Sequence, residues 1–260
     1  MKKQNHELFL CCFLSSCFLS GHAWALGTES GGNWYLTAGV GRTQPLTNSN
    51  NFVGTGPGWP DDHYIANDTH GSAMGIIGGG YTWYRYDEWF PALSLGAQFT
   101  YTTQSKISGV IDQYSLAQFE NYSYNYQFHR STLLGVGKAD IYPLGNFLPY
   151  ATGGLGVSFN TTNNYNEQPL SNVTPRISPG FRSATNWYVS YMVGLGIDYV
   201  ICDNLWLSVE YNYGDFGFAK TGNGVSTPSL AGFDYSNQSI KNKLTANNFL
   251  FSVTYLLNNV

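Results

Sequence analysis

The sequence predicts an all-β protein: an eight-stranded antiparallel transmembrane up-and-down β-barrel with four long extracellular loops and short periplasmic turns. Three observations lead there: an unusual composition, a period-two alternation of apolar residues, and connections that alternate between short and long. Charged residues make up 11% and aromatic residues 17% of the 260 residues, whereas about 25% of an average soluble domain is charged. Disordered chains are charged and poor in aromatics, so disorder is excluded. A net charge of −4 with 12 Lys and Arg residues excludes a nucleic-acid binder.

The N-terminus predicts export. Lys2 and Lys3 precede the apolar segment Leu8–Leu19, which is too short to span a bilayer as a helix. Ala23–Ala25 then supplies a small-x-small cleavage site. We therefore expect residues 1–25 to be a cleaved signal peptide and residues 26–260 to form the barrel domain. The alternative is a lipobox at Leu14–Cys17, in which Cys17 would be lipidated.

Period-two alternation of apolar and small or polar residues predicts the strands. In Leu93–Thr102, for example, leucine, alanine and aromatic residues alternate with Ser, Gly, Gln and Thr. After the signal, no run of 18 apolar residues predicts a membrane helix. The eight predicted strands are Trp34–Gly41, Ala73–Tyr84, Leu93–Thr102, Tyr126–Ile141, Leu148–Phe159, Val189–Tyr199, Leu205–Tyr213 and Phe249–Leu257.

The connections alternate in length, which favours a membrane barrel. The short ones contain turn residues such as Pro, Gly, Asp and Asn, and they are Arg85–Ala92, Tyr142–Phe147 and Ile201–Asn204. The long ones are rich in Asn, Ser, Thr and Gly, as solvated loops are, and they are Arg42–Ser72, Thr103–Asn125, Asn160–Asn186 and Gly217–Thr245. A soluble secreted barrel or sandwich is the alternative that alternation alone leaves open.

Aromatic residues gather near the ends of the predicted strands. Such residues form girdles at the two membrane interfaces of outer-membrane barrels. The predicted girdle contains Trp34, Trp83, Trp89, Tyr199, Trp206 and Tyr255. Because lipid offers no hydrogen bonds to the backbone, the sheet has to close on itself.

In residue types, strand count and loop asymmetry, the mature chain resembles the OmpA-like family of small outer-membrane β-barrels, which includes opacity-protein-like surface antigens. The resemblance implies the bacterial outer membrane, with outer-membrane lipid, lipopolysaccharide and the barrel-assembly machinery as partners. Family members often end in an aromatic residue that this machinery reads. Here Phe251–Tyr255 is followed by further residues, so the signal would be internal. We expect a monomer without a cofactor.

One acid–imidazole cluster lies in the first long connection. It contains Asp61, Asp62 and His63, with Asp68 and His70 nearby. Carboxylate and imidazole groups could serve a hydrolase at the barrel rim or bind a metal. The cluster is local in sequence, whereas catalytic sets usually converge from several strands, and no G-x-S-x-G motif is present. We therefore expect a solvated loop, no enzyme activity and no metal site.

Four charged residues fall on the inward face of their strands. Strand parity places Lys138 and Asp140 on one strand, and Asp198 and Glu210 on two others, in the periplasmic half of the lumen. An unpaired charge there would be costly, so we predict a network between Lys138 and these carboxylates. Hydrated, separate charges are the alternative.

The expected function is a structural or surface-recognition role, adhesin-like, carried by the extracellular loops. A rim hydrolase is one alternative. A narrow channel is another, although eight strands leave an interior that side chains just fill.

Overall fold

The computed structural model describes residues 31–47, 49–55, 58–85, 89–176, 178–225 and 235–257. The predicted signal peptide, with Cys17, lies outside these residues. Within them, no helix is long and apolar enough to cross a membrane.

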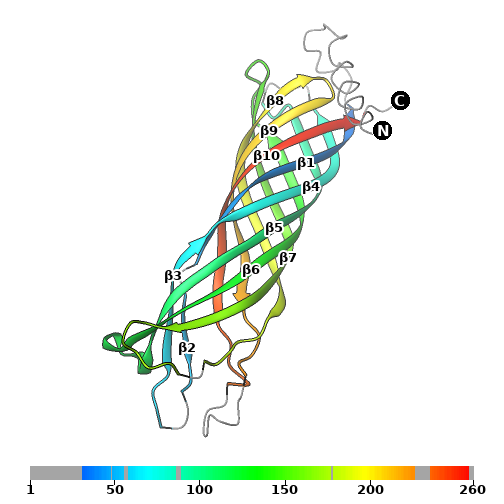
Figure 1. Cartoon of the computed structure of the whole chain (residues 1–260). Helices are drawn as coiled ribbons and strands as arrows, with labels where there is room; N and C mark the ends of the chain where they lie inside the picture. The colour runs from blue at the N-terminus through cyan, green and yellow to red at the C-terminus, as the bar shows by residue number, and fades with distance from the viewer. Residues whose placement is uncertain are drawn as a thin grey trace, which may run out of the picture.

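The chain folds into ten strands and two short 3-10 helices (Figure 1). The strands are β1 (Gly32–Leu46), β2 (Asn50–Val53), β3 (Asp62–His70), β4 (Ser72–Tyr84), β5 (Ala92–Asp112), β6 (Glu120–Asp140), β7 (Phe147–Pro169), β8 (Ala184–Cys202), β9 (Leu205–Lys220) and β10 (Lys241–Leu257). The helices, η1 (Gln113–Ser115) and η2 (Ala117–Phe119), join β5 to β6.

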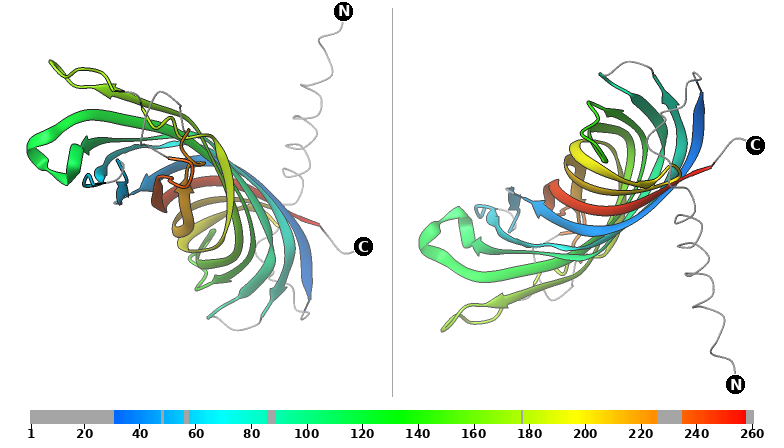
Figure 2. Two further views of the ribbon diagram at one scale, coloured as in Figure 1. Left: turned by 90° about the horizontal axis from the view of Figure 1, so that it is seen from below. Right: turned by 90° about the horizontal axis from the view of Figure 1, so that it is seen from above.

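All strands except β2 and β3 form one closed antiparallel ring. The sheet order is β2-β3-β5-β4-β1-β10-β9-β8-β7-β6, and a further pairing of β5 with β6 closes it. Views along the ring show the strands curving around a common interior (Figure 2). The predicted eight-stranded antiparallel barrel is therefore confirmed.

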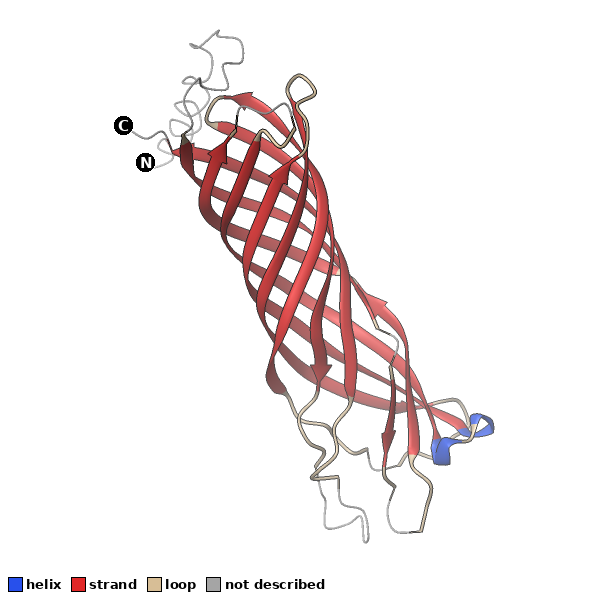
Figure 3. Cartoon of the chain, turned by 180° about the vertical axis from the view of Figure 1, so that it is seen from behind, coloured by secondary structure: helices blue, strands red, loops and turns tan. Residues whose placement is uncertain are grey.

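The two ends of the barrel differ. The described parts of the short connections, 85, 89–91, 141–146 and 203–204, lie at one end, together with the start of β1 and the end of β10; we call it the turn end. The opposite end, the loop end, carries β2 and β3, both 3-10 helices and the described parts of the connections between β7 and β8 and between β9 and β10, which are 170–176, 178–183, 221–225 and 235–240. Figure 3 shows the helices at its tip.

The strands run further toward the loop end than predicted. β5 and β6 each have 21 residues and β7 has 23, so much of Thr103–Asn125 and Asn160–Asn186 is strand rather than solvated loop. Arg42–Ser72 contains β2 and β3, and β3 pairs with the distal part of β5. The physical reason is an inversion of the alternation. Near the turn end the apolar face points outward, whereas toward the loop end it points inward.

The outer wall of the ring is an apolar belt. Its exposed side chains include Leu36, Val40, Ile77, Leu95, Phe99, Leu133, Leu155, Val193, Leu195, Ile197, Val209, Phe251 and Val253. A soluble monomer rarely exposes so large a contiguous apolar surface, but a membrane-spanning barrel presents one.

All six predicted girdle residues lie at the turn end, but one of them faces inward. Trp34, Trp83, Trp89 and Tyr199 are exposed, and the hydroxyl of Tyr255 accepts a hydrogen bond from Asn204 Nδ2 at 3.0 Å. Trp206, in contrast, is only 6% exposed and lies inside the barrel with Leu148, Val200 and Leu256. Its place in the girdle was wrong, because its parity along β9 is that of the inward residues Ser208 and Glu210.

Candidate functional site

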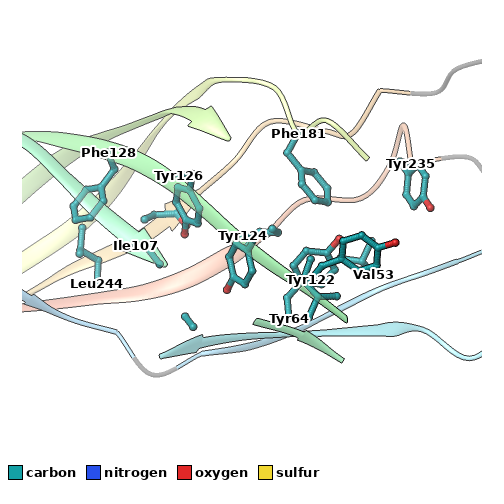
Figure 4. Close-up of a cluster of buried hydrophobic side chains, with 14 of the residues drawn as sticks. Val53, Tyr64, Ile107, Tyr122, Tyr124, Tyr126, Phe128, Phe181, Tyr235 and Leu244 are labelled. Atoms are coloured by element: carbon teal, nitrogen blue, oxygen red, sulfur yellow. The ribbon is translucent and has the colours of Figure 1, made fainter. Parts of the chain in front are cut away.

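The loop end has a hydrophobic core of its own, inside the strand extension (Figure 4). Inward aromatic side chains of β6 pack there against residues from β3, β5, β10 and the long connections. Its members include Tyr64, Ile107, Ile111, Tyr122, Tyr124, Tyr126, Phe128, Phe181, Phe216, Tyr235, Ile240 and Leu244. Because of this core, the loop end is a packed structure rather than a set of free loops.

Arg176, in the connection between β7 and β8, ties this connection across the mouth of the barrel. Its guanidinium forms an ion pair with Asp62 and donates from Nε to Glu167 Oε1 at 2.7 Å and from Nη2 to the Tyr64 hydroxyl at 3.2 Å. It also lies 4.7 Å from the Tyr122 ring centroid. Burial opposes the charge, but Tyr64 and the carboxylates of Glu167 and Asp62 raise the pKa of Arg176 above its ordinary value. The group therefore stays charged and the mouth stays bridged.

The acid–imidazole residues do not come together. Asp62 points inward to Arg176 and accepts the backbone N–H of Tyr114 at 2.9 Å. His63 points outward, stacked on Phe52 at 4.7 Å between ring centroids, with its Nδ1 4.0 Å from the Asp112 carboxylate. The reason is strand geometry, because successive side chains of β3 face opposite sides.

The remaining members of the set lie elsewhere. His70 pairs with Asp68 at 3.4 Å in an exposed position, about 23 Å along β3 from His63 at 3.3 Å per residue. The carbonyl oxygen of Asp61 accepts a hydrogen bond from Ser115 Oγ at 2.7 Å. Among the described residues, no three His, Cys, Asp or Glu side chains are arranged to hold a metal.

An exposed group of apolar side chains stands at the tip of the loop end. We call Trp59, Tyr114, Leu116 and Phe119 the distal aromatic patch. Trp59 is 61% exposed, its ring centroid is 5.4 Å from that of Tyr114, and Tyr114 is 6.4 Å from Phe119. Phe52, also exposed, projects from the adjoining hairpin. These residues lie in two connections that show no periodicity, so the sequence does not predict the patch.

The backbone under the patch is held in an uncommon conformation. Tyr114 has φ 57° and ψ 23°, and Ser115 has φ 58°, in the left-handed region that costs about 1 kcal/mol or more for a residue other than glycine. The bond from the Tyr114 N–H to Asp62 fixes this turn. Asp62 is thus a structural anchor for the patch.

In the lumen at the turn end, the four predicted charged residues lie close together. Lys138 forms an ion pair with Asp198, and its Nζ lies 3.7 Å from Asp140 Oδ1 and 4.1 Å from the Tyr150 ring centroid. Asp198 also accepts a hydrogen bond from Ser208 Oγ at 2.6 Å. Lys138 is thereby paired with both aspartates inside a narrow barrel.

Glu210 joins this group through neutral side chains rather than directly. It accepts hydrogen bonds from the Tyr150 hydroxyl at 3.1 Å and from Asn212 Nδ2 at 2.7 Å. The ring of Tyr150 lies against Gly196, where a Cβ atom would be 2.3 Å from Tyr150 Cζ. Glycine is therefore required at that position, and the turn end of the lumen is filled.

Comparison with known proteins places the chain in a family. A family model, the outer membrane protein beta-barrel domain, matches residues 9–256. No curated protein matches the sequence well enough to count as a relative.

Three solved structures illustrate the similarity. Neisserial surface protein A is 11% identical, with 87% of this chain and 99% of that chain covered and a TM-score of 0.44. Ail of Yersinia pestis, in complex with the heparin analogue sucrose octasulfate, is 10% identical, with 87% and 99% covered and a TM-score of 0.36. The outer membrane protease OmpT of Escherichia coli is 12% identical, with 92% and 100% covered and a TM-score of 0.40.

The family match covers nearly the whole chain and agrees with the closed antiparallel ring and its apolar belt. The resemblance to small outer-membrane barrels and the predicted location are both confirmed. The chain belongs to the outer membrane protein β-barrel family and resides in the bacterial outer membrane.

Proposed function

We propose that this protein is a surface-recognition barrel, adhesin-like, that presents the distal aromatic patch to a protein on an apposed cell. The observation that carries the proposal is the exposure of Trp59, Leu116 and Phe119 at the tip, beyond the apolar belt. Large apolar side chains held in water commonly mark an interaction site. Trp and Tyr are also the residues that most often anchor binding interfaces.

The patch is supported by ordered structure, which favours recognition. The core beneath it, the Arg176 bridge and the Asp62–Tyr114 bond restrict its conformations. Binding of a partner would therefore cost the patch little conformational entropy. We propose a protein partner rather than an anionic glycan, because exposed Asp61 and Glu120 flank the patch.

The proposal requires that the loop end face the outside of the cell and the turn end the periplasm. An epitope inserted at Gln118 should then label on intact cells, whereas one at Gly145 should not. The reverse labelling would contradict the proposed orientation.

Adhesion measures the function directly. When a non-adherent bacterium displays the wild-type protein, it should bind cultured animal cells. The number of bound bacteria should fall at least tenfold when the displayed protein carries both Trp59→Ser and Phe119→Ser. Pretreating the animal cells with protease should abolish binding. Gln118→Ser, an exposed polar change on η2, is the matched control and should bind normally at equal surface display. Equal binding by wild type and double variant, or loss only after glycosidase treatment, would contradict the proposal.

We further propose that the protein is not an enzyme and that its lumen is not an open channel. The Asp62 carboxylate is paired with Arg176, and His63 lies on the other face of β3, so these two residues do not form an acid–base pair with each other. The lumen is filled by the charged group at the turn end and by the aromatic core at the loop end.

Lipopolysaccharide is the lipid partner that the outer wall favours. Lys220 and Lys241 lie directly opposite each other on β9 and β10, a like-charge pair that is destabilising on its own. Lys243 follows on the same face and is paired with Asp215 at 2.6 Å. We propose that lipid phosphates sit between Lys220 and Lys241, and that the barrel-assembly machinery reads Phe251–Tyr255 on β10.

Added lipopolysaccharide should raise the Tm of the detergent-solubilised protein. The rise should shrink in Lys220→Gln combined with Lys241→Gln, but not in Lys106→Gln, an exposed lysine on β5. An equal loss in both variants would mean that charge, rather than this pair, is responsible.

A further inference from the structure

Arg130 is a buried cation that has no charged partner among the described residues. It lies on the inward face of β6 and is only 2% exposed. Its guanidinium carbon is 3.5 Å from the Phe216 ring centroid, and its Nε has no hydrogen-bond partner among the described residues. Within the same part of the chain, no ion pair involves Arg130. A guanidinium that leaves water without compensation is strongly unfavourable.

The inward carboxylates of the turn end are far away, and those of the loop end, Asp62 and Glu167, are paired with Arg176. Asp140 lies on the same strand, about 33 Å further along at 3.3 Å per residue. Glu210 lies on β9, about 20 Å along the strand from Phe216. Both belong to the charged group at the turn end, so neither balances Arg130.

A layer of neutral polar side chains surrounds Arg130. Thr102 and Asn160 are its direct cross-strand neighbours on β5 and β7. Hydroxyl groups continue around the wall, with Thr132 and Ser158 3.0 Å apart and Ser190 donating to Ser158 at 2.8 Å. Hydroxyl and guanidinium N–H groups are the donors that a small anion prefers in a confined polar site.

Several buried polar atoms in this layer have no partner in the described structure. Asn160 donates both Nδ2 hydrogens to backbone carbonyls of Phe216 and Phe218, but its Oδ1 is unpartnered. Across the lumen, Thr43 and Asn248 are paired residues of β1 and β10, and Thr43 Oγ1 and Asn248 Oδ1 are also unpartnered. Buried polar atoms are nearly always hydrogen-bonded, so unpartnered atoms on both walls point to an occupant between them.

We propose that the middle of the lumen holds a small monovalent inorganic anion, chloride under ordinary conditions, on the free edge of the Arg130 guanidinium. Phe216 covers one face of the guanidinium and leaves that edge for the ligand. Thr43 and neighbouring hydroxyl groups complete the donor set, and water molecules satisfy the amide oxygens of Asn160 and Asn248. The anion is small because the aromatic core closes the lumen on one side and Leu134 and Leu250 narrow it on the other.

Bromide tests the site directly. Crystals of the full chain grown in bromide should show an anomalous peak within hydrogen-bond distance of the Arg130 guanidinium in the wild type. The peak should be absent in Arg130→Met and retained in Arg130→Lys. No peak in the wild type, with water at the site instead, would overturn the proposal.

Thermal stability gives a second readout in solution. At equal ionic strength, the Tm in detergent should be several degrees higher in sodium chloride than in sodium gluconate, because an ion that binds only the folded state stabilises it. The difference should vanish in Arg130→Met and persist in Lys106→Gln. Heat-modifiable gel migration shows whether Arg130→Met folds. If it does not fold, the anomalous peak in wild-type crystals grown in bromide tests the proposal. Equal Tm values in both salts for the wild type would also overturn the proposal.

Discussion

The barrel contains two regions that follow opposite rules. Near the turn end, Leu133 of β6 faces outward and Lys138 faces inward. Toward the loop end of the same strand, Tyr124 is buried inside and Asn125 faces outward. The backbone pattern is unchanged, so the difference comes from the surroundings. Lipid outside favours an apolar wall around a polar lumen, whereas water outside favours a polar wall around an apolar core.

Alkaline pH should separate the two regions most strongly. Burial raises the pKa of the loop-end tyrosines Tyr64, Tyr124, Tyr126 and Tyr165 above the ordinary value of 10.0. Because the folded-state pKa lies above the unfolded one, the stabilisation is complete below pH 10 and is lost as the pH rises toward the folded-state values. We expect the loop end to open above pH 10 while the ring stays folded.

Hydrogen exchange and heat-modifiable migration at pH 8 and pH 11 check this prediction. Exchange at the distal parts of β5 and β6 should rise, and the gel shift should persist. If the gel shift disappears at the same pH at which exchange in the distal parts of β5 and β6 rises, the two regions unfold as one unit.

A charge placed in the loop-end core should have the next largest effect. Phe128→Asp buries an unpaired carboxylate and removes a ring, and we expect a loss of about 5 kcal/mol or more in local stability. Limited proteolysis should then cut the extension while the ring resists. Asn125→Asp, on the outward face of β6, is the matched control and should resist proteolysis like the wild type. If Phe128→Asp also resists, the core does not hold the extension together.

Removal of the lumen cation tests the turn end. Lys138→Met leaves Asp198 and Asp140 unpaired, and we expect a loss of about 3–5 kcal/mol in the free energy of unfolding. Lys138→Met combined with Asp198→Asn should lose less than Lys138→Met alone, because the second change removes an orphan charge. Urea unfolding in lipid vesicles measures the cycle.

Glu210→Gln serves as the comparison for that cycle. Glu210 contacts Tyr150 and Asn212 rather than Lys138, so its coupling to Lys138→Met should be smaller than that of Asp198→Asn. Additive losses for Lys138→Met and Asp198→Asn would exclude their pairing.

Parity along a strand made part of the fold predictable. It placed Lys138, Asp198 and Glu210 on one face, and it would have placed Trp206 inside had its aromatic character not suggested a girdle. The start of β6 also carries a strand pattern, since Tyr122 and Tyr124 alternate with polar residues just before the predicted strand Tyr126–Ile141. This pattern is inverted, with the apolar face inward, so an expected apolar outer wall leaves both residues in the predicted loop Thr103–Asn125.

Other features leave no local signal in a single sequence. Arg176 and Asp62 are 114 residues apart, and Arg176 lies in a connection without periodicity. Trp59 and Tyr114 meet only because the β2–β3 hairpin pairs with β5. Such contacts depend on the register of strands distant in sequence, which composition and spacing do not specify.

The bridge at the mouth should have the smallest effect of the four. Arg176→Met keeps the length of the side chain but leaves Asp62 and Glu167 without their cation, and we expect a local loss of about 3 kcal/mol. The consequence should be confined to the patch, where the Tyr114 N–H depends on Asp62, so its hydrogen exchange should speed up while that of Tyr126 is unchanged. Arg182→Met, an exposed change in the same connection, is the control and should alter neither. If Arg176→Met leaves exchange at Tyr114 as in the wild type, the aromatic core alone orders the loop end. The patch would then owe its rigidity to the same apolar packing that separates this region from the lumen below it.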